Sequence, residues 1–330
     1  MTTVLEAINH GLRQCLATSE DVYLLGEDVL DPYGGAFKAS RGLSSAFPQR
    51  VITTPISEPG FIGVAVGMAL RGLRPVVEIM FGDFITLGAD QLINHASKMR
   101  WMSADEVRVP LVLRTPMGGR RGYGPTHSQS LEKHFLGTPG LRVVAPNPWF
   151  SPEQLLINAV LYDDDPVLFI EHKILYSTPV WAAEAGEYKC SLTGGLYPAA
   201  RIRIAGAPQP ALTITAYGYA SCLAAEAMRH LAYEHELFAE VIAPTRLSPA
   251  ATELLMNSAS ATGAVITVEE APGEFGWGSE MITALQLAGL RGLRQQRVAA
   301  QAMPVPSSGP LEAAVLPQVD DIVAAALETV

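Results

Sequence analysis

Short apolar runs that alternate with helical patterns constrain the fold of this chain more than any other feature. Each run is brief and nearly free of charge, which is typical of strands buried on both faces of a sheet. In the first half of the chain we predict strands at residues 22–26, 51–53, 74–80, 109–114, 141–146 and 166–171. Helical patterns flank them at residues 3–18, 43–47, 59–69, 87–100 and 152–161. This alternation predicts a parallel, doubly wound α/β sheet.

The same alternation starts again after a weakly patterned stretch. Residues 178–210 contain many alanines, glycines and prolines, so we predict a linker that partly wraps the surface. Beyond it we predict strands at 212–218, 238–242 and 263–268, and helices at 220–234, 250–258, 278–289 and 318–327. A length of 330 residues also suggests two domains. We therefore expect α/β domains over residues 1–177 and 211–330, joined by the linker over 178–210.

The composition predicts a soluble protein with neither nucleic acid nor a membrane as its main partner. With 48% hydrophobic and 17% charged residues, the chain can bury substantial cores, and its net charge of −10 disfavours anionic partners. The first residues do not resemble a signal peptide, and no apolar run approaches the length of a membrane span. Cys15, Cys190 and Cys222 lie far apart, as buried thiols of a reducing compartment do, so we expect a cytoplasmic protein.

One segment combines an acidic residue with glycines at helical spacing. Glu58 precedes Pro59, which suits the start of a helix because its missing N–H would be unpaired there. On one interpretation, Glu58 only interacts favourably with the helix dipole. However, Gly60, Gly63 and Gly67 form a bare stripe, although each glycine weakens a helix by roughly 1 kcal/mol. Such a stripe lets a ligand or another backbone come close, which favours a functional role.

Glu58, Gly63 and Gly67 resemble the glutamate-and-glycine signature of the pyrimidine-binding domain in thiamine diphosphate enzymes. Other short motifs narrow the resemblance to one family of these enzymes. They are Gly-Glu-Asp at 26–28, Tyr-Gly-Gly-Ala-Phe at 33–37, Thr-His-Ser-Gln-Ser at 126–130 and Pro-Gly-Leu at 139–141. Nearly the whole chain resembles the beta subunit of a 2-oxo acid dehydrogenase E1 component, of the pyruvate, branched-chain or acetoin type. The resemblance implies a pyrimidine-binding domain followed by a transketolase C-terminal-like domain.

The resemblance also implies catalytic roles for Glu58 and His127. Thiamine diphosphate itself provides most of the electronic stabilisation that the reaction needs. The protein must favour the imino tautomer of the cofactor's aminopyrimidine. A carboxylate bonded to ring N1′ in a dry pocket does this, and Glu58 beside an apolar helix suits the task. A lone loop histidine such as His127 is usually a surface residue, but imidazole also suits proton transfer near neutral pH.

Three further cofactor contacts are implied in the same way. Phe84 follows a predicted strand and can place its ring against the pyrimidine, although aromatic residues at such positions more often belong to the core. Ile56 is implied by the resemblance alone. Met80 departs from the polar amide of many relatives, so a contact there is either absent or made by the softer thioether.

The resemblance alone implies a potassium site as well. Its oxygen ligands would come from Leu111, Val160, Leu161, Asp163 and Asp165. Hard oxygen ligands suit such a cation. On the alternative interpretation, the acidic run at residues 163–165 is a solvated turn before Pro166.

Several polar residues keep two interpretations. Glu27 and Asp28 follow a predicted strand, where they serve either the turn itself or a ligand at the carboxyl end of the sheet. Arg120 and Arg121, in the glycine-rich loop at residues 117–127, either bind a carboxylate or an acidic partner, or form a solvated loop tip. The turn at residues 268–280 is interpreted as assembly architecture or a partner surface.

The chain is expected to carry only half of an active site. This superfamily binds the diphosphate through a divalent metal held by Gly-Asp-Gly and a distant Asn, whereas Gly82-Asp83-Phe84 lacks the second glycine and the Asn. No phosphate-binding glycine loop of another kind replaces it. Magnesium would therefore be bound mainly by an alpha subunit, with the cofactor between the chains of an α2β2 heterotetramer.

The expected function is oxidative decarboxylation of a 2-oxo acid, with acyl transfer to a lipoyl group on an acyltransferase (E2). One alternative is a two-chain synthase that transfers the activated unit to another acceptor. A second alternative is a non-catalytic partner that retains the fold for assembly. The sequence does not identify the 2-oxo acid.

Overall fold

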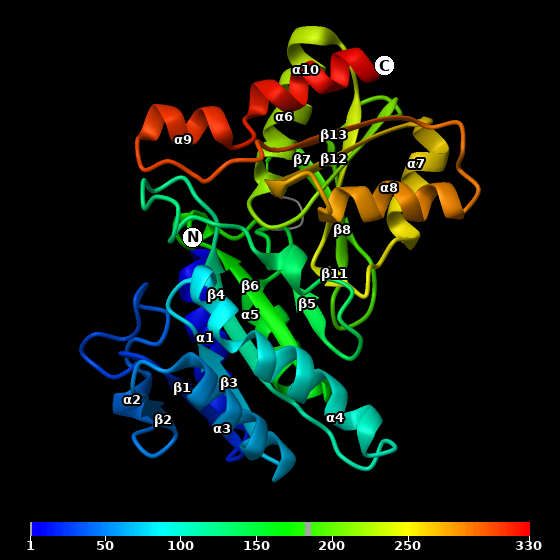
Figure 1. The fold of residues 1–330 in the computed structure, drawn as a ribbon. Helices are drawn as coiled ribbons and strands as arrows, with labels where there is room; N and C mark the ends of the chain where they lie inside the picture. The colour runs from blue at the N-terminus through cyan, green and yellow to red at the C-terminus, as the bar shows by residue number, and fades with distance from the viewer. Residues whose placement is uncertain (1, 182–185) are drawn as a thin grey trace.

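The first sheet of the computed structural model, which describes residues 2–181 and 186–330, contains seven strands in the order β11-β5-β6-β4-β3-β1-β2 (Figure 1). Their bounds are Val22–Gly26 (β1), Val51–Thr53 (β2), Arg74–Glu78 (β3), Val112–Met117 (β4), Arg142–Val144 (β5), Val167–His172 (β6) and Arg246–Ser248 (β11). Neighbouring strands are parallel except for β11, which pairs with β5 in the antiparallel direction. The predicted parallel sheet is thereby confirmed.

Helices cover both faces of this sheet, as the doubly wound fold requires. On one face, α1 (Val4–Thr18) packs on α5 (Pro152–Ile157) over a shared apolar core. Thr3 and Glu6 form a capping box that fixes the start of α1. The other face carries α3 (Glu58–Leu70), the 3-10 helix η1 (Gly82–Gly88), the π-helix η2 (Gln91–Ala96) and α4 (Ser97–Met102). Shorter helices are α2 (Leu43–Ala46), η3 (Glu132–His134), η4 (Asn158–Tyr162) and η5 (Leu175–Ser177).

The second sheet has six strands in the order β13-β12-β9-β10-β8-β7. Their bounds are Tyr188–Leu192 (β7), Ala199–Ile204 (β8), Leu212–Ala216 (β9), Ala239–Pro244 (β10), Ala264–Pro272 (β12) and Arg294–Ala300 (β13). The first four strands in that order run parallel, whereas β8 and β7 are antiparallel to their neighbours. The helices of this half are α6 (Ala220–His235), α7 (Glu253–Thr262), α8 (Trp277–Leu287), α9 (Gly309–Val315) and α10 (Val319–Thr329).

The predicted linker is wrong where β7 and β8 lie. These strands form an antiparallel hairpin at the edge of the second sheet, so much of the stretch 178–210 belongs to that sheet. Its pattern is weak because β7 exposes most of its residues instead of burying both faces. Residues 182–185 of the predicted linker lie outside the described residues.

Three other predictions differ from the structure. The strand predicted at 109–114 begins only at Val112, because Leu111 N–H bonds back to Val109 O in a tight turn. The helix predicted at 87–100 is divided among η1, η2 and α4. Strand β13 and helix α9 escaped prediction, since the first four residues of β13 are polar and α9 is short.

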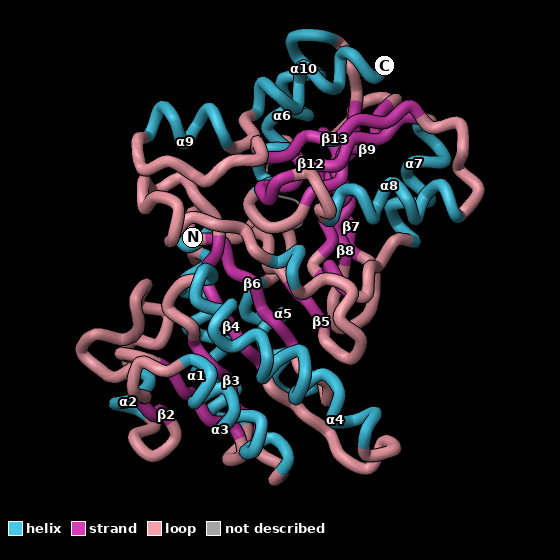
Figure 2. Tube along the Cα trace, in the orientation of Figure 1, coloured by secondary structure: helices cyan, strands magenta, loops and turns pink. Residues whose placement is uncertain are grey.

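One buried cluster spans the two halves of the chain. Strand β11 comes from the second half yet pairs within the first sheet. Apolar residues of both halves, such as Ile79 and Ile242, belong to the same buried cluster. The loop that follows β4 lies beside α9 of the second half (Figure 2). In residues 2–181 and 186–330, no helix combines the length and apolar character needed to cross a membrane.

Candidate functional site

The carboxyl ends of β1 and β2 bring two acidic side chains together. These strands end at Gly26 and Thr53, which are paired in register, and the chain continues from them to Glu27 and Glu58. Glu58 is the first residue of α3 and is 4% exposed, and Glu27 is 3% exposed. Within the described residues, Glu27 Oε1 has no hydrogen-bond partner. A buried carboxylate oxygen without a protein donor is suited to a ligand that supplies one.

The charge of Glu27 depends on its burial. Burial raises the pKa of Glu27 to about 7, and the charges of Glu58 and Asp28 act in the same direction. The Glu27 carboxyl is therefore partly protonated close to neutral pH. A carboxyl group poised in this range suits proton exchange with a bound ligand.

His127 lies in an aromatic pocket. Its ring centroid is 4.8 Å from that of Phe81 and 5.3 Å from that of Phe84, with interplanar angles of 80° and 82°. Phe84 belongs to η1, and η1 packs on α3, the helix that begins with Glu58. The histidine and the aromatic residue predicted from the sequence are therefore neighbours, on the face of the sheet that also carries Glu58.

The other two predicted cofactor contacts differ in exposure. Met80 is half-buried and directly precedes Phe81. Ile56 is 83% exposed, two residues before the buried Glu58. So exposed an apolar side chain has its packing surface available to a ligand or another chain. Its role as a cofactor contact stays a prediction.

Two carboxylates of the second half hold the glycine-rich loop that follows β4. Glu270, on β12, accepts from Gly119 N–H at 2.7 Å and from Arg120 Nε at 3.0 Å. Glu312, on α9, accepts from the backbone N–H groups of Arg120 and Gly122 at 2.7 and 3.0 Å. Arg120 thus joins the two halves of the chain and is not a solvated loop tip.

Glu270 acts as a fixed negative charge in this contact. Burial alone would raise its pKa, but His172 and Arg120 beside it, together with Gly119 N–H, lower the pKa of Glu270 to about 2. His172 Nε2 lies 3.1 Å from Glu270 Oε1. Arg121, by contrast, is exposed, and its guanidinium donates to the carbonyl oxygen of Lys173 at 3.0 Å.

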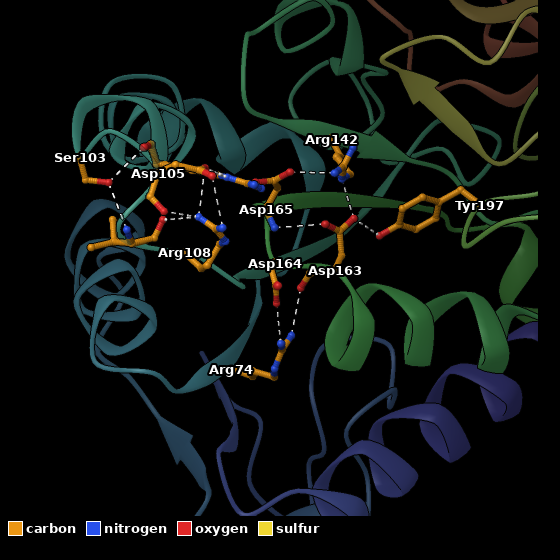
Figure 3. Close-up of polar contacts among 11 residues, drawn as sticks. Arg74, Ser103, Asp105, Arg108, Arg142, Asp163, Asp164, Asp165 and Tyr197 are labelled. Atoms are coloured by element: carbon orange, nitrogen blue, oxygen red, sulfur yellow. Dashed lines mark hydrogen bonds and ion pairs between the residues drawn. The ribbon is translucent and has the colours of Figure 1, made fainter.

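Arginines surround the acidic run at residues 163–165 (Figure 3). Asp163 Oδ2 lies 2.6 Å from Arg142 Nε and accepts from the Tyr197 hydroxyl at 2.7 Å. The other two carboxylates are paired as well: Asp164 with Arg74, and Asp165 with Arg100 and Arg142. The run is therefore a turn between η4 and β6 whose three carboxylates are all paired, with Asp163 buried and Asp164 exposed.

Arg74 also binds two oxygens that the predicted potassium site would use. Its Nη1 donates to the carbonyl oxygens of Val160 and Asp163, each at 3.0 Å. Leu111 O accepts from Val167 N–H at 2.8 Å. A cation here would have to share oxygens that already accept hydrogen bonds, one lone pair each remaining. In the described part of the chain, no group of three or more His, Cys, Asp or Glu side chains is placed to hold a metal ion.

The glycine stripe of α3 faces outward. Gly60, Gly63 and Gly67 are exposed, and Val64 beside them is 58% exposed. A Cβ atom added at Gly67 would meet no atom within 4 Å. At Gly63 an added Cβ would meet only Gln91, at 3.8 Å, and at Gly60 only Ser57 of the same turn, so the stripe is open toward Gly67. A contact with another subunit stays a prediction.

Comparison with known proteins shows the family. The model of the transketolase pyrimidine-binding domain matches residues 1–179, and that of the transketolase C-terminal domain matches residues 202–322. The pyruvate dehydrogenase E1 component subunit beta-2, mitochondrial, of Oryza sativa subsp. japonica is 38% identical over 331 residues, which cover 98% of this chain and 85% of that protein. The chain belongs to the family of 2-oxo acid dehydrogenase E1 beta subunits.

Other relatives agree with this E1 beta assignment. The 2-oxoisovalerate dehydrogenase subunit beta of Pseudomonas aeruginosa is 37% identical over 301 residues, which cover 86% of this chain and 82% of that protein. A solved structure, described as "Split gene transketolase, inactive beta4 tetramer", covers 100% of this chain and 98% of its own, with a TM-score of 0.77. At 21% identity that likeness shows the fold alone, and it confirms the predicted two-part α/β architecture of the E1 beta chain.

Sequence reasoning missed the residues that support the loops of this E1 beta chain. Lys173 is fully buried directly after β6, and Glu270 is buried on β12. Both are charged residues at the ends of apolar strand runs, which was a usable signal. Their partners could not be read from the sequence, because Glu270 meets Gly119 across 151 positions.

Proposed function

We propose that this chain is the beta subunit of a thiamine diphosphate-dependent 2-oxo acid dehydrogenase E1 component. Such an enzyme decarboxylates a 2-oxo acid and transfers the acyl group to a lipoyl group on an acyltransferase. The observation that carries the proposal is the buried carboxylate of Glu58 at the start of α3, beside Glu27. This arrangement fits the pyrimidine of thiamine diphosphate, because a ring nitrogen can share a proton with the carboxylate in a dry site.

The residues of this chain have distinct roles in the proposal. When bound, thiamine diphosphate supplies the acidic carbon that attacks the 2-oxo group. Glu58 holds a proton at the pyrimidine N1′, and Glu27 lies beside it with a pKa raised to about 7 by burial and by the charges of Glu58 and Asp28. Phe84, with Ile56 and Met80, packs on the cofactor. His127 exchanges protons with the substrate end of the site.

The diphosphate half of the site is assigned to a separate alpha subunit. Asp83, in the incomplete Gly82-Asp83-Phe84 sequence, is buried, and its Oδ1 accepts from Gln129. Its Oδ1 is therefore bound within this chain, whereas its buried Oδ2 has no hydrogen-bond partner among the described residues, and the sequence around it lacks the second glycine and the Asn of a complete metal site. The proposal places magnesium mainly on the alpha subunit and the cofactor between the chains of an α2β2 heterotetramer. A cytoplasmic location also stays a prediction.

Potassium binding is a separate part of the proposal. The site would use Leu111, Leu161 and Asp165, together with the second lone pairs of the Val160 and Asp163 carbonyl oxygens that accept from Arg74. No catalytic step depends on it.

The proposed function is tested by combining the chain with an alpha subunit that carries Gly-Asp-Gly. We expect no turnover by the isolated chain, and 2-oxo acid-dependent reduction of a lipoyl protein by the assembled complex. Glu58→Ala should lower kcat about 100-fold or more, because general acid–base groups contribute about 10²–10⁴ in rate. Reaction with a different acceptor but not with the lipoyl protein would support the synthase instead.

A matched control separates catalysis from helix stability. Glu253 is also an acidic residue at the first position of a helix, α7, but it is exposed. Glu253→Ala should leave kcat and cofactor binding unchanged. Full turnover by the isolated chain would contradict the half-site. Unchanged rate and cofactor binding in Glu58→Ala would favour a purely structural subunit.

A further inference from the structure

Lys173 is a buried cation that the proposed function does not use. It follows β6 at the carboxyl end of the first sheet and is 0% exposed. Its Nζ donates to the carbonyl oxygen of His127 at 2.8 Å and lies 5.4 Å from the ring centroid of Phe81. A buried ammonium group without compensation is costly, so a lysine at this position needs a structural or functional reason.

Asp83 forms a second contact on the other side of the same loop. It lies in η1 and is 7% exposed. Its Oδ1 accepts from the backbone N–H of Gln129 at 3.2 Å and from Gln129 Nε2 at 2.8 Å. Gln129 is two residues beyond His127. Lys173 and Asp83 therefore hold the loop at positions 127 and 129, from two different elements.

The charges around Lys173 connect these two residues electrostatically, although no direct ion pair joins them among the described contacts. Burial lowers the pKa of Lys173 to about 8, whereas the nearby negative charge of Asp83 opposes this shift most strongly. Glu270 and Glu312 act in the same direction as Asp83, and Arg121 acts against them. The carboxylate of Asp83 thus helps to keep the ammonium group charged, and a charged donor makes the stronger hydrogen bond.

We propose that Lys173 and Asp83 are positioning residues, which hold the loop at His127 and at Gln129 so that the His127 imidazole stays against Phe81 and Phe84. Neither residue acts on the substrate. Asp83 thus has a positioning role in this chain, although it belongs to a sequence that resembles an incomplete metal-binding motif. The positioning itself does not depend on the proposed function. Its consequence, a faster proton exchange at His127, does rest on the proposed function.

The position of His127 can be measured without any activity. The chain contains 7 histidines, and ¹³C-labelled histidine side chains give one signal each, with His127 assigned through His127→Gln. In Lys173→Met, the His127 signal should shift and broaden, while the distant His10 and His95 keep theirs. Lys133 also donates to a backbone carbonyl oxygen, that of Glu274 at 3.0 Å, so Lys133→Met is the matched control and should leave the His127 signal unchanged.

The consequence is measured in the complex with the alpha subunit. Lys173→Met should lower kcat about 10- to 100-fold with less than a threefold change in thiamine diphosphate affinity, since misplacing a reacting group costs rate more than binding. Asp83→Ala should behave similarly. Asp83→Asn should recover most of the rate, because its amide oxygen still accepts from Gln129.

The outcomes distinguish this proposal from the proposed function. If the complex is inactive but the His127 signal moves in Lys173→Met, the positioning is supported and the proposed function fails. If the complex is active and Lys173→Met retains both the wild-type kcat and the wild-type His127 signal, the positioning is overturned. Should Lys173→Met not fold, as judged by its thermal melt, the comparison of Asp83→Ala with Asp83→Asn decides, and equal wild-type rates in both overturn the proposal.

Discussion

The carboxyl group of Glu27 makes the stability of the chain depend on pH. Its pKa is raised from 4.5 to about 7 in the folded state, chiefly by burial. The folded state therefore favours the protonated form. The stability contribution of Glu27 is fully present below the unfolded pKa and is lost as the pH rises through about 7.

We expect Glu27→Gln, which cannot ionise, to remove this dependence. The variant should match the wild type in Tm near pH 4.5 and exceed it at pH 8, with the difference growing between these values. Thermal melts across this range provide the measurement. Glu20→Gln changes an exposed glutamate and serves as the control. A constant difference in Tm at all pH values would contradict the assignment of the raised pKa to Glu27.

Single residues were predictable where their chemistry is local. Glu58 stands out because a carboxylate, a proline and a glycine stripe follow each other in the sequence. His127 stands out less, and only the motif around it, at residues 126–130, suggested a catalytic role. Lys173 could not be connected to His127, because 46 positions separate them and their contact depends on the carboxyl ends of separate strands.

At the scale of elements, the loop between β4 and η3 depends on its contacts with β12 and α9. The pKa of Glu270 is lowered to about 2, so its contribution to stability is present above 4.5, the ordinary value, and is lost as the pH falls through about 2. We expect Glu270→Gln to cost about 1.5–3 kcal/mol of unfolding free energy at neutral pH, since it removes hydrogen bonds to a charged group.

Denaturant unfolding and limited proteolysis of the loop test this expectation. Cleavage after Arg120 or Arg121 should accelerate in Glu270→Gln, because the contact of the loop with β12 weakens and only the contact with Glu312 keeps its full strength. Glu274→Gln changes an exposed carboxylate four residues away and should leave the loop protected. An unchanged cleavage rate in Glu270→Gln would show that Glu312 alone holds the loop.

Elements with two buried faces were predicted well, and edge elements were not. Strands β1, β3 and β9 are buried along nearly their whole length and are rich in apolar residues, because helices cover both sides of their sheets. Strands β7 and β13 lie at the two edges of the second sheet and expose polar residues. Their sequences satisfy neither the buried-strand pattern nor a strict alternation, so periodicity alone cannot find them.

At the scale of the whole molecule, the paired turn at residues 163–165 lies where the two halves meet. Asp163 contacts Tyr197, which precedes β8 of the second sheet. If potassium shares the oxygens around Arg74, it binds only the folded chain. A potassium concentration of ten times its Kd then adds about 1.4 kcal/mol to the free energy of unfolding. We therefore expect a higher Tm in potassium chloride than in choline chloride at equal ionic strength.

The size of this effect should depend on the Asp165 carboxylate, which the proposal counts among the ligands. In Asp165→Asn the difference in Tm between the two salts should shrink, whereas Asp105→Asn, which changes an exposed carboxylate, should retain it. Equal Tm values for the wild type in both salts would show that Arg74 has replaced the cation. The whole-molecule features of the site were predictable only through the resemblance, because the proposal assigns the diphosphate half to another chain.

The strand exchange at β11 has a consequence for any attempt to divide the protein. A fragment that ends before Arg246 would retain a complete pyrimidine-binding sequence but leave one side of β5 without its partner. Bare strand edges invite pairing with other chains, so this fragment would self-associate even though most of its core is intact. The segment that contains β11 thus covers an edge of the first sheet. If the gene were split between the two halves, the second polypeptide would have to bind the first and cover this edge.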